Sequence, residues 1–123
     1  MKMLVDSREQ KPLSFVHEYI TEVIVTKLDI GDYGAEFSDG TRPSIYFERK
    51  SLGDLYGTLG AGYPRFRKEL ERAKASGSLL FLIIEDNFTN ILRGYDRSSI
   101  KGISIVRKLF TLFWKYNLHF ICC

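Results

Sequence analysis

The sequence of 123 residues has few cysteines and no long apolar segment. Its only two cysteines, Cys122 and Cys123, are adjacent at the end of the chain. Adjacent cysteines cannot cross-link distant parts of a fold, and no paired Cys/His spacing is present, which excludes a disulfide scaffold and a zinc finger. The longest apolar run, Leu79–Ile84, is far shorter than the roughly 20 residues of a membrane span. An acid as early as Asp6 argues against a secretory signal. We therefore expect a reducing, cytoplasmic or nuclear setting.

The composition suits one globular domain with an uneven distribution of charge. Hydrophobic residues make up 45% of the chain and aromatic residues 14%, which is enough to form a core. Residues 1–62 carry 7 basic and 10 acidic side chains, whereas residues 63–123 carry 11 basic and 5 acidic ones. An acidic half followed by a basic half suits a divalent cation on one side and a polyanion on the other. A solvated, Lys/Arg-rich helix surface explains the same counts.

The apolar patterns predict an α/β fold, with a central mixed β-sheet flanked by helices. We expect strands over residues 3–6, 23–28, 33–37, 44–49, 79–84 and 119–123. Residues 14–21 suit either an extended segment or one helical turn. Asp39-Gly40 is a strong turn signal and predicts a hairpin between the third and fourth strands. The six apolar residues of Leu79–Ile84 do not alternate with polar ones, so we expect this strand to be fully buried.

Three helices are expected in the second part of the chain. Ser51 with Asp54 is typical of a capping box that opens a helix to about Leu59. Pro64 suits the first turn of a second helix, which Gly77 ends. Ser98 or Ser99 opens the last helix, and the apolar residues expected to face the core are Ile100, Ile103, Val106, Phe110 and Phe113. The chain stops at the last strand, so we expect an end that is either truncated or completed by a partner.

Asp32, Glu48 and Lys50 form the constellation that carries chemistry. Glu48 and Lys50 are two apart on an expected strand, so their side chains share one face. A hairpin turning at Asp39-Gly40 pairs residues whose numbers sum to about 79–81, which places Asp32 opposite Glu48. Two carboxylates supply hard oxygens for Mg²⁺ or Mn²⁺, and a lysine can hold a water or offset charge on a phosphate. The alternative is a surface hairpin with cross-strand salt bridges.

Three ordered motifs extend this pattern, and together they resemble a known family. The chain reads V-D-S-R-E from Val5, G-D-Y from Gly31 and E-R-K-S-L-G-D from Glu48. These resemble the V-D-x-R-E, G-D-Y and E-R-K-x-x-x-D motifs of the XPF-type nuclease domain. The segments Arg65-Phe66 and Leu82–Glu85 are also similar to that family, so the resemblance covers nearly the whole chain.

The resemblance implies a restriction-endonuclease-like core of the PD-(D/E)xK class that cleaves DNA with Mg²⁺ or Mn²⁺. Asp32 and Glu48 match metal-binding carboxylates, and Lys50 matches the catalytic lysine. The remaining motif positions expected in the active site are Asp6, Arg8, Arg49 and Asp54. By strand alternation the Arg49 side chain points away from Glu48 and Lys50, so its backbone carbonyl is the group expected to reach a metal.

Some motif residues also have purely structural interpretations. Asp6 suits an Asx-turn, Arg8 suits a structural pair with Asp6 or Glu9, and Asp54 suits a helix cap. We interpret Glu9 as a solvated turn charge and leave Glu85 outside the site.

Basic and aromatic residues of the second half indicate partners. We expect Arg65, Arg67 and Lys68 to contact DNA near a helix start, with Arg93, Arg97 and Lys101 as a second patch. The relatives prefer flaps, forks and junctions and usually work as dimers. Many carry a helix-hairpin-helix domain after the nuclease, whereas we expect a single nuclease domain over residues 1–123 without that further domain, which suits a phage or bacterial source. The aromatic last helix, with Phe110, Phe113 and Trp114, suits core or dimer-interface packing. The alternative function is a non-catalytic DNA-binding or scaffolding subunit of a nuclease dimer.

Overall fold

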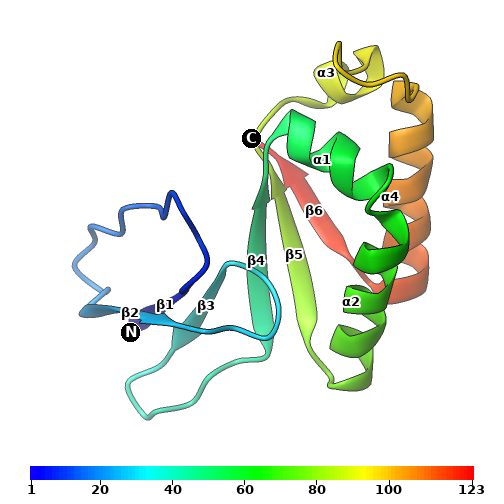
Figure 1. The fold of residues 1–123 in the computed structure, drawn as a ribbon. Coiled ribbons are helices and arrows are strands. Elements are labelled where there is room, and N and C mark those ends of the chain that lie inside the picture. Colours follow the sequence, from blue (N-terminus) through cyan, green and yellow to red (C-terminus); the bar gives the residue numbers. More distant parts are fainter.

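The computed structural model describes all 123 residues as one mixed sheet with helices packed against it (Figure 1). The six strands are β1 (Lys2–Asp6), β2 (Glu22–Thr26), β3 (Tyr33–Glu36), β4 (Ile45–Lys50), β5 (Leu79–Ile84) and β6 (His119–Cys122). The four helices are α1 (Leu52–Leu59), α2 (Tyr63–Ala75), α3 (Phe88–Arg93) and α4 (Gly102–Tyr116). The strand order is β2-β1-β3-β4-β5-β6, which confirms the expected mixed α/β architecture.

The register of the central strands brings the motif residues to one region. β3 runs antiparallel to β1 and to β4, while β4, β5 and β6 are parallel. Tyr33 pairs with Phe47, which agrees with the pairing sum expected from the Asp39-Gly40 turn. The Asp39 carboxylate accepts a hydrogen bond from the Thr41 amide at 2.9 Å and stabilises that turn. Asp32 therefore precedes β3 directly opposite the end of β4.

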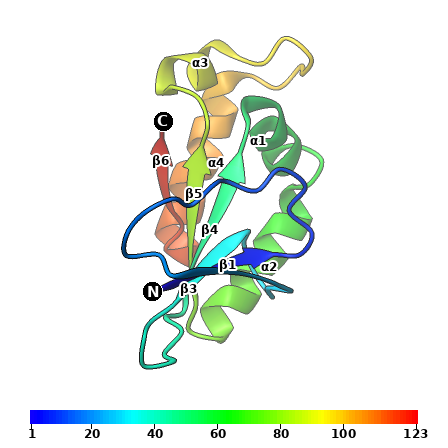
Figure 2. The same cartoon turned by 90° about the vertical axis from the view of Figure 1, so that its left-hand side faces the viewer.

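The core lies between the sheet and one layer of helices. Figure 1 shows α1, α2 and α4 on the same side of β4, β5 and β6. Leu80, Leu82 and Ile84 of β5 are buried in this core, whereas Leu79, Phe81 and Ile83 are only half-buried. The expectation of a fully buried strand was wrong, because helices cover only one face. The segment between β1 and β2 crosses the other face (Figure 2).

The helix that precedes β6 presents a different face to the core than its sequence suggests. Its buried residues are Gly102, Ile105, Val106, Leu109 and Leu112. Ile103, Phe110 and Phe113 are exposed, so the predicted stripe was wrong for these three positions. The helix is apolar around most of its circumference, and periodicity alone did not distinguish its two apolar stripes. It begins after Lys101 and has no side-chain cap, rather than starting at Ser98 or Ser99.

Two short features complete the fold. Helix α3 was not expected, although Asn87 caps it by accepting a hydrogen bond from the Asn90 amide. Residues 14–21 form neither a strand nor a helix. None of the four helices has the length and apolar character needed to cross a bilayer.

Candidate active site

The ends of β1 and β4 and the start of β3 position the acidic motif residues. The Asp6 amide donates to the Asp32 carbonyl at 2.8 Å, and the Asp32 amide donates to the Phe47 carbonyl at 2.8 Å. Gly31 precedes Asp32 with φ +72°, and a Cβ there would lie 3.1 Å from the Phe47 carbonyl oxygen. Glycine tolerates this backbone conformation and this close approach, which fixes the entry of Asp32 into the site.

Glu48 and Lys50 lie side by side at the end of β4. The Glu48 side chain is only 13% exposed, and its Oε2 lies 3.7 Å from Lys50 Nζ. That separation is an ion pair but is too long for a hydrogen bond. Glu48 Oε2 is buried and has no hydrogen-bond partner. Burial raises the pKa of Glu48 to about 7, despite the favourable charge of Lys50.

Asp32 is half-buried beside this pair. Its Oδ2 accepts a hydrogen bond from the Arg49 amide at 2.9 Å, which holds the carboxylate next to the Glu48 position. Burial raises the pKa of Asp32 above its usual range, and this hydrogen bond only partly offsets the shift. Asp32 and Glu48 line the same hollow of about 300 Å³, as the hairpin register predicted.

Asp6 and Arg8 form a satisfied pair at the edge of that hollow. Arg8 donates from Nε to Asp6 Oδ2 at 2.9 Å and from Nη2 to Oδ1 at 3.3 Å. The Leu28 amide donates to Asp6 Oδ1 at 2.9 Å. Burial alone would raise the pKa of Asp6, but the hydrogen bonds from Arg8 and Leu28 outweigh it and lower the pKa. Both oxygens are thus occupied, which favours a positioning role for Asp6 over direct contact with a cation.

Arg49 points to the opposite face of the sheet, as strand alternation predicted. Its guanidinium donates to the Lys11 carbonyl at 2.7 Å and pairs with Glu85 at 3.0 Å. The Tyr33 hydroxyl also accepts from it, at 3.3 Å. The side chain therefore ties the segment after β1 to the sheet. Glu85, which we left outside the site, is the partner of Arg49.

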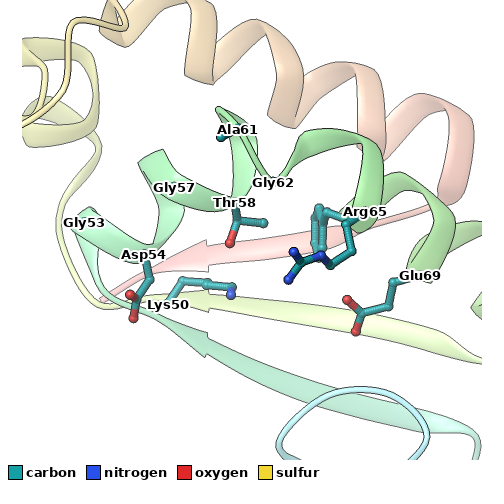
Figure 3. A pocket seen from close by; sticks show the side chains of 10 residues that line it. Lys50, Gly53, Asp54, Gly57, Thr58, Ala61, Gly62, Arg65 and Glu69 are labelled. Carbon is teal, nitrogen blue, oxygen red and sulfur yellow. The ribbon is translucent and has the colours of Figure 1, made fainter.

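Lys50 and Asp54 share a second hollow of about 530 Å³, between α1 and α2 (Figure 3). Ser51 Oγ accepts from the Asp54 amide at 3.1 Å, which confirms the predicted cap. The Asp54 carboxylate makes no hydrogen bond in return and is exposed in the hollow. Only half of the capping box is formed, and the carboxylate is free for other contacts.

Glu69 is a site residue that the sequence analysis missed. It lies on α2, and burial raises its pKa. The charges of Asp32 and Glu69 both contribute to the raised pKa of Glu48, so the three acids lie close to one another. Arg65, Glu69 and Arg72 follow helical spacing on one face of α2 and line the Asp32–Glu48 hollow. This spacing was a usable signal, although without the tertiary structure it did not indicate which face met the strands.

The predicted DNA-contacting residues separate into two groups. Arg65 lines both hollows, and Figure 3 shows it projecting between Lys50 and Glu69. Arg67 packs its guanidinium over the Tyr63 ring at 5.3 Å, and Arg67 and Lys68 line neither hollow. In the second patch, Arg93 and Lys101 line a separate hollow between α3 and α4, whose lining does not include Arg97.

The residues fit a divalent cation held by few protein ligands. No group of three or more His, Cys, Asp or Glu side chains is arranged to hold a metal ion on its own. Mg²⁺ usually keeps several waters and takes only one or two carboxylates. Asp32 and Glu48 provide two carboxylates of raised pKa, and the buried Glu48 Oε2 lacks a partner. A cation there would offset the cost of burying both charges.

Comparisons with known proteins identify the family and the fold. The ERCC4 domain model matches residues 5–123. XPF from Aeropyrum pernix has a similar structure, with a TM-score of 0.68 and 24% identity over 98% of this chain and 57% of that one. The structure of the same protein in complex with DNA has a TM-score of 0.69 and 23% sequence identity, over 98% of this chain and 55% of that one.

This chain thus spans little more than half the length of the solved structures that it matches. No curated protein matches it in sequence. The shared fold confirms the expected restriction-endonuclease-like core. Because the family model covers nearly all of the sequence, the chain belongs to the ERCC4-domain family and is an XPF-type nuclease domain.

Proposed function

We propose that the protein is a DNA endonuclease that hydrolyses phosphodiester bonds with Mg²⁺ or Mn²⁺ and prefers branched DNA such as flaps, forks or junctions. The observation that carries the proposal is the buried, unpartnered Glu48 Oε2 beside Asp32 and Lys50. Leaving a carboxylate oxygen unsatisfied costs folding free energy, so such a group indicates a function. A similar structure is described in complex with DNA, which supports the nucleic-acid substrate.

Each side chain has a defined role in this proposal. Asp32 and Glu48 hold the cation, with the Arg49 carbonyl as a third oxygen ligand. When bound, such a cation supplies positive charge at the phosphate and a water of lowered pKa. Lys50 either holds the attacking water or offsets the negative charge that develops on the phosphate. Arg8 and Asp54 line the two hollows and are available to the substrate, while Asp6 orients Arg8.

A cleavage assay with matched lysine variants tests the proposal. Flap, fork and plain duplex DNA are incubated with the protein in Mg²⁺, in Mn²⁺ and in a chelator. We expect cleavage only with a cation, and at least a hundredfold loss in Lys50→Ala, while DNA binding persists. Lys115→Ala removes an exposed lysine from the end of α4 and serves as the control. DNA binding without cleavage under either metal would instead support a non-catalytic subunit.

We also propose that two copies of the chain associate through the edge of the sheet beside β6. Phe110, Phe113 and Trp114 of α4 are exposed, Trp114 to 87%. Phe110 and Phe113 line an apolar hollow of about 410 Å³ together with Phe81, Phe120 and Ile121. Exposed apolar surface of this kind is typical of an interface. Light scattering after size exclusion should give twice the monomer mass, and Trp114→Glu should lower it, whereas Glu71→Gln should not.

A further inference from the structure

Three hollows form a trough along α2. The first, of about 530 Å³, is the Lys50 hollow, and the second, of about 300 Å³, is the Asp32–Glu48 hollow. The third, of about 440 Å³, continues to Ser76 and Ser78. Neighbouring hollows share lining residues: Arg65 belongs to the first two and Arg72 to the last two. The trough therefore passes the proposed cation site and continues on both sides of it.

Free cationic groups line this trough. Arg65 and Arg72 form no side-chain hydrogen bond and no ion pair within the protein. They are seven residues apart, which is about 10 Å along the helix axis and nearly two full turns. An unpaired guanidinium presents a planar fork of donors that suits a phosphate group. The trough thus has an unpaired guanidinium at each end of the Asp32–Glu48 hollow, and Glu69 lines all three hollows.

Two glycines of α1, Gly53 and Gly57, line the first hollow together with Asp54 and Thr58. A Cβ at Gly53 would lie 2.9 Å from the Tyr95 hydroxyl, so packing explains that glycine. A Cβ at Gly57 would meet nothing within 4 Å, and its backbone is helical. Because a Cβ would fit, internal packing does not account for Gly57. Keeping glycine inside the helix nevertheless costs about 1 kcal/mol of stability relative to alanine.

We propose that the first hollow receives the sugar–phosphate backbone of one extended DNA strand next to the cleaved phosphate, and that Gly57 keeps the hollow open for it. The inference rests on the proposed nuclease function. Lys50 and Arg65 project into this hollow (Figure 3). Arg65 also lines the Asp32–Glu48 hollow, and Lys50 forms an ion pair with Glu48. A DNA strand in contact with α1 leaves no room for a side chain at position 57. The glycine at this position would therefore serve substrate binding.

Three variants separate this role from folding. In Gly57→Leu the added side chain lies back over the turn that contains Gly53 and fills the hollow. Gly57→Ala adds one methyl group and should raise the melting temperature by about 2–6 °C. Ala75→Leu adds similar bulk to an exposed position at the end of α2, outside all three hollows. We would measure melting temperature, affinity for a single-stranded oligonucleotide and, with Mg²⁺, cleavage of flap DNA.

The expected result is at least a tenfold loss of oligonucleotide affinity and cleavage in Gly57→Leu, with a melting temperature at or above that of the unmodified protein. In Ala75→Leu, oligonucleotide affinity and cleavage should stay within twofold of the unmodified protein. Unchanged affinity and cleavage in a folded Gly57→Leu overturn the inference but leave the nuclease proposal intact. If the unmodified protein binds DNA without cleaving it, a loss of affinity in Gly57→Leu still supports the trough. Absence of any oligonucleotide binding by the unmodified protein overturns it.

Discussion

The ends of β1 and β4 carry the same acid-x-base spacing, in Asp6/Arg8 and in Glu48/Lys50, but the two acids differ in their hydrogen bonds. Asp6 is 5% exposed at its side chain and accepts hydrogen bonds from Arg8 and the Leu28 amide. Glu48 is 13% exposed, and its Oε2 accepts no hydrogen bond. Burial favours a raised pKa at both acids, but the hydrogen bonds from Arg8 and the Leu28 amide lower the pKa of Asp6, whereas the pKa of Glu48 rises to about 7. Donors thus distinguish the structural acid from the one suited to a cation.

Removing the charge of the unsatisfied acid should have the largest effect. Glu48→Gln keeps the shape of the side chain but removes a proposed cation ligand. We expect cleavage in Mg²⁺ to fall at least a thousandfold, with a comparable loss in Asp32→Asn. Gel-based cleavage rates and calorimetric titration of Mg²⁺ measure the two consequences. Turnover equal to that of the unmodified protein in either variant would exclude the assigned site.

The same substitution should change stability in a pH-dependent way. The pKa of Glu48 is raised from 4.5 to about 7, so the folded state binds this proton more tightly than the unfolded state. The corresponding stability is fully present below about pH 4.5 and is lost as the pH rises through about 7. At pH 8 without metal, Glu48→Gln should be more stable than the unmodified protein by on the order of 3 kcal/mol. Urea unfolding at pH 4.5 and pH 8 tests this, and an equal difference at both pH values contradicts it.

Breaking the hydrogen-bonded pair of Asp6 and Arg8 should mainly lower the stability of the fold. Asp6→Asn replaces an acceptor of charged hydrogen bonds from Arg8, and we expect it to cost about 2 kcal/mol of unfolding free energy at pH 7. Because the pKa of Asp6 is lowered, this cost should be present above the ordinary aspartate pKa and vanish as the pH falls through the lowered value. Chemical denaturation reports it, and Mg²⁺ affinity should change little. A loss of Mg²⁺ affinity without a loss of stability would make Asp6 a ligand instead.

Removing the unpaired guanidinium of Arg65 should have the smallest effect. Arg65→Ala should weaken DNA binding a few-fold and reduce the slope of log affinity against log salt by about one. Arg107→Ala removes an exposed arginine from α4, outside the hollows, and provides the comparison. Fluorescence anisotropy across a salt series measures both. An unaltered slope in Arg65→Ala would contradict a contact between Arg65 and a DNA phosphate.

Local signals predicted most of the elements that carry the motif residues. The Asp39-Gly40 turn placed Asp32 opposite Glu48, and Ser51 and Pro64 marked the starts of α1 and α2 correctly. The prediction failed where a helix had two apolar stripes. Ile105, Leu109 and Leu112 face the core, whereas Ile103, Phe110 and Phe113 do not, because packing against α1, α2 and α3 selects one stripe.

The sequence by itself determined the register of β3 against β4, the starts of α1 and α2, and the grouping of Asp32, Glu48 and Lys50, since these follow from turn chemistry, helix capping and a side-chain period of two. Only the tertiary structure decided that Asp6 is fully hydrogen-bonded, that Glu48 Oε2 is not, and that Glu69 of α2 joins the site. The physical reason is that solvation of a carboxylate depends on donors from distant segments. These donors meet it only when helices and strands pack.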